Sequence, residues 1–145
     1  MAVKTNAVRL VQQAGICCEE RFYEYDEEDL SGTHAADAIG MPQEQVFKTL
    51  VARGERTGIN VFCISVCCEL DLKKAAKAVG EKSITMLPAK ELLPLTGYVH
   101  GGCSPVRTCS GKYGREFCLT KTCGTLWIVS WSSMILCADD AVCLL

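Results

Sequence analysis

A lysine in the middle of an otherwise apolar segment is the first residue of the sequence that points to chemistry. The segment covers residues 46–51 and carries Lys48 followed by Thr49. As a strand it would have apolar residues on both of its faces. Burying an ammonium group is costly unless the group binds something. Two interpretations stay open at this point. Lys48 either extends its charge to water from a strand end or holds a polar or anionic ligand.

A second candidate is the run at residues 96–105, which places Gly101 and Gly102 ahead of Ser104. Glycines let a backbone approach a ligand closely, and their N–H groups can bind a phosphate or a developing oxyanion. A lone glycine pair more often marks a tight turn. The prediction of a binding loop therefore rests on the whole run of Thr, Gly, Tyr, Gly, Gly, Ser and Pro residues.

The aromatic and histidine side chains give a weaker indication of a site. Phe22, Tyr23 and Tyr25 lie close together, and a tyrosine can line a pocket and stack on a base. Aromatic residues of strands more often pack in the core. The chain has only His34 and His100, and neither can be assigned to a Ser-His-Asp or Cys-His set. The sequence therefore indicates no protein nucleophile.

Eleven cysteines are an unusual number for this length. The number is odd and no export signal is evident, which argues against a disulfide framework. No Cys-x-x-Cys pair occurs, and two histidines provide no paired-histidine zinc motif. We expect the cysteines to be small buried apolar residues, and we expect neither a metal nor a cofactor.

Composition predicts one folded domain over residues 1–145. Hydrophobic residues make up 49% of the chain, and the formal net charge is −2. Tight binding of a nucleic acid by the chain alone normally needs a basic field, so such a partner would be held locally or with help. No secretory signal and no apolar run of membrane-spanning length is present, so we expect no membrane contact and a cytoplasmic location.

The elements that would position these residues alternate irregularly between helix and strand. Periodicity and capping residues predict helices over residues 5–14, 31–39 and 70–80 and from Pro88 onward, with a helical tail from Asp139. Strands are predicted over residues 16–25, 46–53, 59–66, 83–87, 116–120, 125–130 and 134–137. Two consecutive strands that are apolar on both faces imply a sheet covered on both sides or curled into a barrel, in a mixed α/β domain.

Four stretches in this order resemble the YbaK/EbsC family. They are Lys-Thr-Asn-Ala-Val at 4–8, Val-Phe-Lys-Thr-Leu at 46–50, Glu-Leu-Asp-Leu-Lys-Lys at 69–74, and Thr-Gly-Tyr-Val-His-Gly-Gly-Cys-Ser-Pro at 96–105. The family consists of aminoacyl-tRNA deacylases related to the editing domain of bacterial prolyl-tRNA synthetase. The similarity extends from about residue 4 to about residue 107.

The resemblance implies a fold, a reaction and partners. The fold would be a curled mixed β-sheet or barrel flanked by helices. The reaction would be trans-editing hydrolysis of a mischarged tRNA, with Cys-tRNA(Pro) as the first candidate. The partners would be the acceptor end of the aminoacyl-tRNA and prolyl-tRNA synthetase, and no cofactor is implied. Catalysis would be assisted by the substrate's own thiol or ribose hydroxyl, with the protein supplying position and electrostatics.

The same resemblance implies roles for individual residues. Lys48 matches the essential lysine, which would anchor the 3′-terminal adenosine or its phosphate, and Thr49 beside it joins the substrate-binding residues. Tyr23 matches the pocket tyrosine, with Tyr25 as the alternative register. Backbone N–H groups of Gly101 and Gly102 would face the ester. Ser104, together with Pro105, would shape that loop.

The C-terminal part departs from the family pattern. Trp131 follows Val129 and Ser130 where the family has a glycine- and arginine-rich turn, and Asp139 and Asp140 do not match its pocket aspartate securely. This departure motivates an alternative function, a non-catalytic module that binds aminoacyl-tRNA or a nucleotide. A third interpretation, a thiol-redox or metal protein, rests on the number of cysteines alone.

Overall fold

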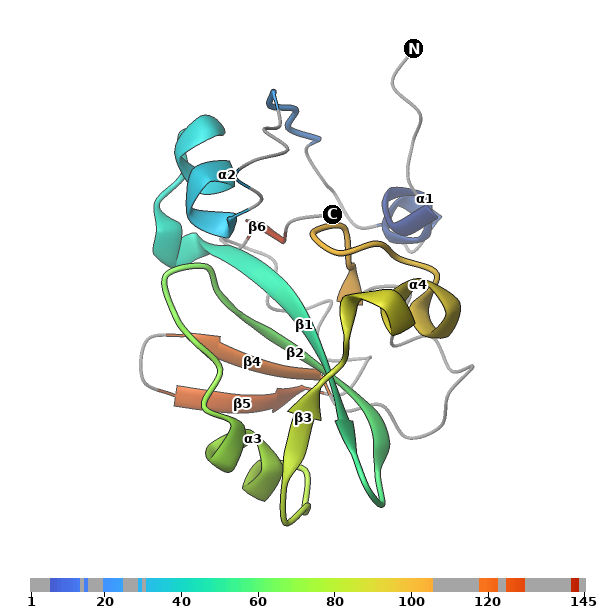
Figure 1. The fold of residues 1–145 in the computed structure, drawn as a ribbon. Helices are drawn as coiled ribbons and strands as arrows, with labels where there is room; N and C mark the ends of the chain where they lie inside the picture. Colours follow the sequence, from blue (N-terminus) through green and yellow to red (C-terminus); the bar gives the residue numbers. More distant parts are fainter. Residues whose placement is uncertain are drawn as a thin grey trace.

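A mixed six-stranded sheet runs through the fold, and helices flank it (Figure 1). The computed structural model describes residues 6–13, 15, 20–24, 29, 31–105, 118–122, 125–129 and 142–143. Within these residues the helices are α1 (Asn6–Gln13), α2 (Gly32–Ala38), the 3₁₀ helix η1 (Gln43–Gln45), α3 (Leu72–Ala78) and α4 (Ala89–Thr96). The strands are β1 (Val46–Gly54), β2 (Gly58–Ser65), β3 (Ile84–Met86), β4 (Cys118–Thr122), β5 (Thr125–Val129) and β6 (Val142–Cys143).

The strand order of the sheet is β3-β1-β2-β4-β5, and β6 pairs with β1. The β1 strand is antiparallel to β2 and β3 and parallel to β6. The β2 strand is parallel to β4, which is antiparallel to β5. The predicted mixed α/β fold is therefore confirmed. Among the described strands no pairing joins β3 to β5, so this part of the sheet is open rather than a closed barrel.

The β1–β2 hairpin is the longest ladder among the described strands. Its paired positions run in one register from Phe47 opposite Ser65 to Gly54 opposite Gly58, with no bulge between them. Side chains of a strand alternate between the two faces of a sheet. This register therefore decides which residues of the lysine segment share a face.

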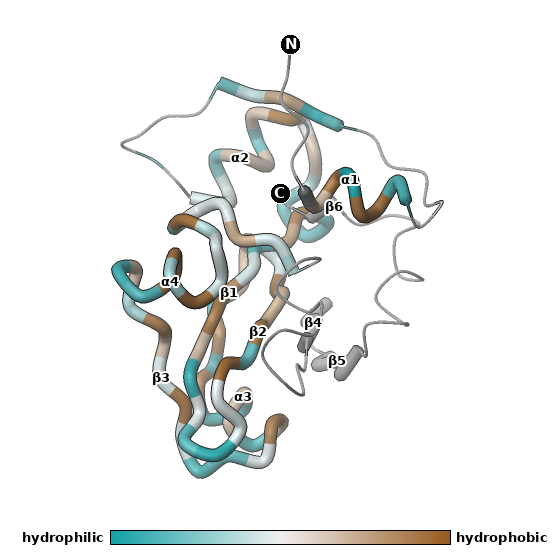
Figure 2. The backbone as a smooth tube through the Cα atoms, turned by 90° about the vertical axis from the view of Figure 1, so that its right-hand side faces the viewer, coloured by the Kyte–Doolittle hydropathy of each residue, from teal (hydrophilic) through white to brown (hydrophobic). Residues whose placement is uncertain are grey.

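Both faces of the hairpin are covered, as the two apolar faces of its strands predicted. One face packs against α3 in a buried cluster of Ala52, Phe62, Ala75, Ala76, Val79 and Ile84. The opposite face packs against α4 in a cluster of Val51, Leu87, Leu92 and Cys103. Near the start of β1, α2 contributes Ala36 to a third cluster with Val46 and Val66. Figure 2 shows hydrophobic residues along β1 and β2 and hydrophilic ones at the turn that joins them.

The helix starts follow from capping side chains. The Ser31 hydroxyl accepts a hydrogen bond from the backbone N–H of His34 at the start of α2. The carboxylate of Asp71 accepts from the N–H groups of Lys73 and Lys74 at the start of α3, which also lowers its pKa. Leu72, the first residue of α3, is 38% exposed. No helix in the described part of the chain is long and apolar enough to cross a membrane.

Two local predictions are wrong within the described residues. Residues 20–24, expected in a strand, form no regular element, and Phe22 is 72% exposed. Strand β6 lies where a helical tail was expected, and it extends the β1 edge at Val46 and Phe47. The strand predicted at residues 134–137 lies outside the described residues.

The turn between β1 and β2 is fixed by a buried carboxylate. The Glu81 side chain is 3% exposed, and its Oε1 accepts from the backbone N–H groups of Arg56 (2.7 Å) and Thr57 (2.5 Å). Arg56 also donates to the carbonyl of Gly80 and places its Nε 3.8 Å from Glu81 Oε2. A side chain at Gly54 would come within 2.7 Å of the same carboxylate, so only glycine fits there.

We predict that Glu81→Gln lowers the urea midpoint at pH 7 and that the difference from the parent shrinks in acid. The Thr57 N–H above all, and then the Arg56 N–H, hold the pKa of Glu81 below its ordinary value of 4.5. A lowered folded-state pKa gives stability that is present above the unfolded-state value and is lost as the pH falls through the folded-state value. Urea unfolding at pH 7 and at pH 3 measures both effects.

The exposed neighbour Glu55 provides the matched control. Glu55→Gln should leave the midpoint unchanged at both pH values. An equal loss of stability for Glu81→Gln at pH 7 and pH 3 would contradict the proposed charge effect and leave only a packing effect.

Candidate functional site

Lys48 lies near the start of β1, and its side chain is half-buried. It is paired with Ile64, which is fully buried. The alternation of the strand gives Lys48 the same face as Val46, Leu50 and Ala52, which is the face covered by α2 and α3. The ammonium group therefore belongs to an apolar face, as the sequence indicated.

Thr49 takes the opposite face of the same strand. Its Oγ1 lies 3.7 Å from Sγ of its cross-strand partner Cys63. The alternation aligns Thr49 with Val51, which shares a buried cluster with Cys103. Thr49, rather than Lys48, thus shares a face with the residue that anchors the glycine loop.

The glycine loop begins at the end of α4. Gly97 ends that helix with a φ of 77°, a left-handed conformation that favours glycine. The Thr96 hydroxyl donates to the carbonyl of Leu92 (2.7 Å) and accepts from the N–H of Tyr98 (3.1 Å). These bonds fix the direction in which the chain leaves the helix and enters the loop.

The paired glycines form a tight turn with unequal roles. The N–H of Gly102 donates to the carbonyl of Val99 at 3.1 Å, and Gly101 has a φ of 83° while His100 keeps a negative φ. These features are typical of a type II turn. The Gly102 amide was expected to face the ester, but it is already donated within the turn. The sequence carried the signal, because glycine in the third position is what this turn requires.

The residues after the turn are its anchor. Cys103, Ser104 and Pro105 are all buried, and Cys103 Sγ donates to the carbonyl of Val99 at 3.8 Å. Burial raises the pKa of the Cys103 thiol. Ser104 is 1% exposed, so its position agrees with a role in shaping the loop. The turn is thus presented to solvent from a fixed base.

Tyr23 stands apart from the other predicted site residues. It is 39% exposed and lies in the segment at 20–24 that has no regular structure. It does not belong to the buried clusters found among the described residues. Tyr25, the alternative pocket tyrosine, lies outside the described residues. The structure therefore places Thr49 on the face of β1 that packs against the anchor of the glycine loop, and it places Lys48 on the opposite face of the same strand.

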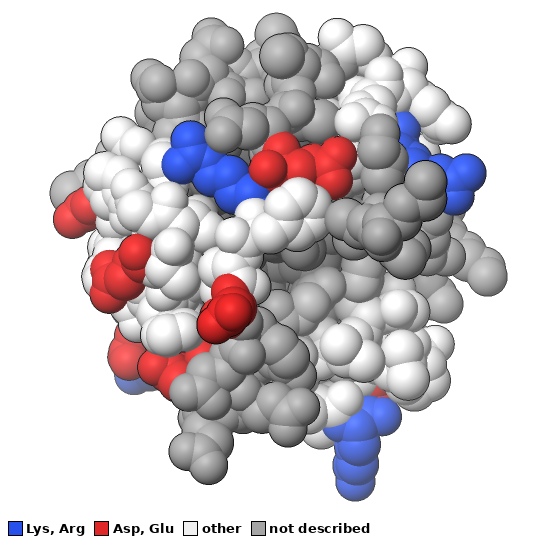
Figure 3. All heavy atoms as spheres, turned by 90° about the horizontal axis from the view of Figure 1, so that it is seen from above, with Lys and Arg blue, Asp and Glu red and all other residues white. Residues whose placement is uncertain are grey.

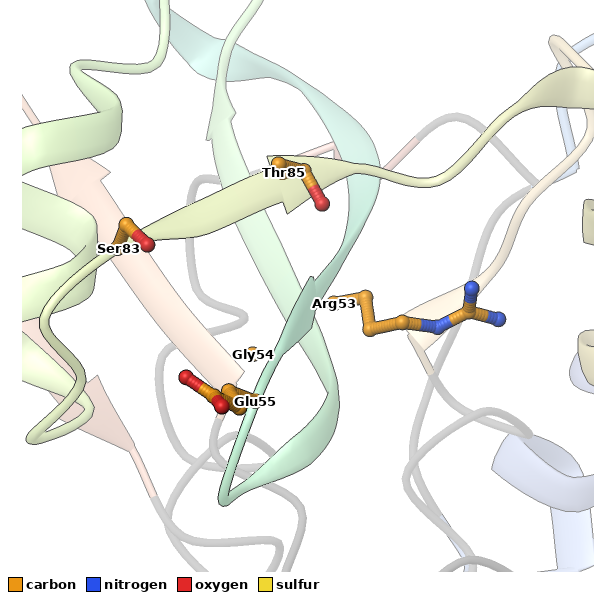
Figure 4. Close-up of a pocket in the computed structure, with 5 residues that line it drawn as sticks. All are labelled: Arg53, Gly54, Glu55, Ser83 and Thr85. Carbon is orange, nitrogen blue, oxygen red and sulfur yellow. The ribbon is translucent and has the colours of Figure 1, made fainter.

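Two shallow cavities lie at the other end of the hairpin. One, of about 240 Å³, is lined by Arg53, Gly54, Glu55, Ser83 and Thr85 (Figure 4). The Arg53 side chain points away from the others in that view and pairs with Glu91 of α4 at 2.8 Å. The second cavity, of about 310 Å³, is lined by Glu55, Arg56, Glu81 and Lys82. Neither includes a predicted site residue, and both border the fixed turn.

The charges of the described surface are mixed. On the face seen from above, Figure 3 shows small acidic and basic groups, one basic group lying directly beside an acidic one. In the part of the chain that the structure describes, no three His, Cys, Asp or Glu residues lie close enough to hold a metal ion. The predicted site residues in the described part of the chain offer the ammonium group of Lys48, the hydroxyl groups of Thr49 and Ser104, and backbone amides.

Comparison with known families identifies the fold and the site segments together. A family model described as the aminoacyl-tRNA editing domain matches residues 30–113, which is more than half of the chain. The chain belongs to the aminoacyl-tRNA editing domain family. The match includes Lys48, Thr49 and the whole glycine loop, whereas Tyr23 precedes it. The resemblance read from the sequence motifs is therefore confirmed.

A curated relative supports the same family. A protein of Enterococcus faecalis named as a candidate Cys-tRNA(Pro)/Cys-tRNA(Cys) deacylase, EbsC, is 45% identical over 103 residues. The matched segment covers 71% of this chain and 63% of that relative, so the chain spans less than two thirds of the relative's length.

Solved structures support the fold. The crystal structure of a hypothetical protein has a TM-score of 0.64 at 17% identity, covering 93% of this chain and 95% of that one. The crystal structure of a candidate trans-editing enzyme for prolyl tRNA synthetase has a TM-score of 0.61 at 22% identity, with 97% and 96% covered. At these identities the likeness establishes a shared fold.

We predict that the two glycines of the turn respond differently to alanine. Gly101→Ala places a side chain at a φ of 83° and should lower the free energy of unfolding by about 1–2 kcal/mol. At Gly102 the new Cβ would lie 3.6 Å from the nearest atom, a Val99 methyl, which is ordinary contact. Gly102→Ala should therefore stay within about 0.5 kcal/mol of the parent in urea unfolding. Equal losses for the two variants would refute the turn assignment.

Proposed function

We propose that the protein is an aminoacyl-tRNA deacylase that edits mischarged tRNA, with Cys-tRNA(Pro) as its substrate. The match of the editing-domain family over residues 30–113 carries this proposal, because it contains both Lys48 and the glycine loop. The 45% identity to a relative named as a candidate Cys-tRNA(Pro)/Cys-tRNA(Cys) deacylase supports this choice of substrate. Residues 1–145 act as one editing domain in the cytoplasm, and prolyl-tRNA synthetase helps to hold the tRNA.

The site residues bind two different parts of the terminal nucleotide. Lys48 binds the phosphate or the adenosine at the 3′ end of the tRNA, and the glycine loop faces the aminoacyl ester. The ribose separates the phosphate from the ester carbonyl, so anchors on opposite faces of β1 can serve one substrate. The loop has a fixed base in buried Cys103 and Ser104, which supports its role in positioning.

Gly101 is the glycine that presents its amide to the ester. Among the hydrogen bonds of the described residues, the Gly102 N–H is donated to Val99, whereas the Gly101 N–H has no partner. A backbone N–H aimed at a developing oxyanion stabilises the transition state without reorganisation. The attacking group is the cysteinyl thiol or the ribose hydroxyl of the substrate. Lys48, Thr49 and the loop hold that group and the ester in place. The original ester C–O bond breaks, the ribose oxygen that leaves takes up the proton of the attacking group, and water then hydrolyses the new thioester or ester to release the amino acid.

We predict that Lys48→Met lowers the rate of Cys-tRNA(Pro) deacylation by about 10²-fold, the usual effect of removing one charged or hydrogen-bonding anchor. Methionine keeps an unbranched stem of similar length in the half-buried position, so the fold should persist. Lys73→Ala, on the exposed side of α3, is the matched control and should keep the parental rate. Release of amino acid from purified charged tRNA, with thermal melting as a check on folding, measures the effect.

A substrate panel distinguishes editing from binding alone. Cysteinyl-, alanyl- and prolyl-tRNA(Pro) are compared with and without prolyl-tRNA synthetase, and cysteinyl-tRNA(Pro) should be deacylated fastest. If the parent protein releases none of the amino acids yet binds a non-hydrolysable aminoacyl-adenosine analogue, the proposed hydrolase is wrong and the binding module is favoured. Parental rates for Lys48→Met would instead refute the role of that lysine.

A further inference from the structure

Two adjacent cysteines, Cys67 and Cys68, lie at the turn that follows β2. The proposed function does not use them. The turn is closed by the N–H of Cys68, which donates to the carbonyl of Ser65 at 3.0 Å. Cys67 is exposed and Cys68 is half-buried, and both are present as thiols. Their sulfur atoms lie 4.0 Å apart. The sulfurs are therefore close neighbours, but adjacent Cα atoms are only about 3.8 Å apart, less than in ordinary disulfides, so closing the bond requires the backbone to adjust as well as the side chains.

The hydrogen bonds around Cys67 fix where its proton lies. The Ser65 hydroxyl donates its single proton to the carbonyl of Gln43 at 2.9 Å. The contact of 3.0 Å between Ser65 Oγ and Cys67 Sγ must therefore be donated by the thiol. This arrangement holds the exposed Cys67 side chain in one orientation, with its sulfur near Cys68.

Among the cysteines whose side chains the structure describes, the other two lack this combination of exposure and a neighbouring thiol. Cys63 lies in β2 and Cys103 lies in the loop after the glycine turn, and both are buried, at 3% and 9% exposure. Burial raises the pKa of Cys103, which reduces its share of the reactive thiolate. An accessible cysteine beside a second one that can resolve it is the arrangement found at thiol-oxidation sites.

We propose that Cys67 and Cys68 form a thiol-oxidation site that reacts with small disulfides and closes into a Cys67–Cys68 disulfide. The Cys67 thiolate attacks one sulfur of the small disulfide, forms a mixed disulfide and releases one thiolate. The Cys68 thiolate then attacks the Cys67 sulfur, forms the bond within the protein and releases the second thiolate. Two protein thiols are oxidised and one small disulfide is reduced to two thiols, so electrons and protons balance.

The position of the pair gives the reaction a structural consequence. Closure requires a sulfur separation of about 2.05 Å and removes the proton that the Cys67 thiol donates to Ser65, so that hydrogen bond is lost. Ser65 is paired with Phe47, the neighbour of Lys48, and the N–H of Val66 donates to the carbonyl of Val46 at 2.9 Å. The thiol pair therefore lies at the same end of the ladder as Lys48. A disulfide strained by such a tight ring is also easily reduced again.

The test exposes the folded full-length protein to glutathione disulfide, stops the reaction with acid and alkylates the remaining thiols after denaturation. Trypsin then releases residues 57–73, which contain Cys63, Cys67 and Cys68. We expect this peptide to gain one alkyl group, on Cys63, and to carry a Cys67–Cys68 disulfide that dithiothreitol reverses. Cys68→Ser should trap glutathione on Cys67. Cys67→Ser should react at least about tenfold more slowly at Cys68, because the exposed attacking thiol is absent.

Three results would overturn the proposal. Alkylation of both Cys67 and Cys68 while cysteines elsewhere are oxidised would show that this peptide is not the site. Two glutathione groups on the peptide with no internal disulfide would exclude closure. A disulfide from Cys63 to either neighbour would show that another pair reacts. Each of these measurements detects a covalent change at the cysteines, so none of them depends on deacylase activity.

Discussion

The register of the β1–β2 ladder is the constraint on which the rest of the structure depends. It runs uninterrupted from Phe47 and Ser65 to Gly54 and Gly58. Strands β3 and β6 attach to the free edge of β1, and β4 attaches to the free edge of β2. A shift of one residue would exchange the two faces of the hairpin. Lys48 would then face α4, and Val51 would leave the cluster that holds the glycine loop.

The register of the ladder also determines the position of the glycine loop. Val51 packs with Cys103, and the buried Cys103 and Ser104 lie directly beyond the turn. The turn itself needs no side chain, because the Gly102 amide and the positive φ of Gly101 define its shape. The N–H of Gly101, which the turn holds in place, would require little reorganisation when a ligand binds. Little reorganisation is the condition for electrostatic stabilisation by backbone amides.

The sequence predicted the hairpin well because two strands that are apolar on both faces need cover on both sides. It also placed helix starts near the observed caps Ser31 and Asp71, where a short polar side chain meets backbone amides that lack partners. It failed at residues 20–24, because strand preference in aromatic residues reflects packing, and Phe22 is exposed here. It failed at β6 because that two-residue strand depends on pairing with the distant residues Val46 and Phe47. The sequence grouped Lys48 and Thr49 with the glycine loop and did not separate their faces, because which helix covers which face depends on the packing. The bond of the Gly102 amide needed the turn to be recognised.

The two ends of the ladder are built for different purposes. At the turn, Glu81 accepts from two backbone amides and Gly54 leaves no room for a side chain, so this end is fixed. At the other end, Lys48 enters an apolar face, and the exposed Cys67 follows the last paired residues. Groups that act on ligands carry a cost in stability, such as a desolvated charge or an accessible thiol. Lys48 and Cys67 lie at the end of the ladder away from the fixed turn. The turn can therefore hold the register of the hairpin although a charge and an exposed thiol at the other end add little to its stability.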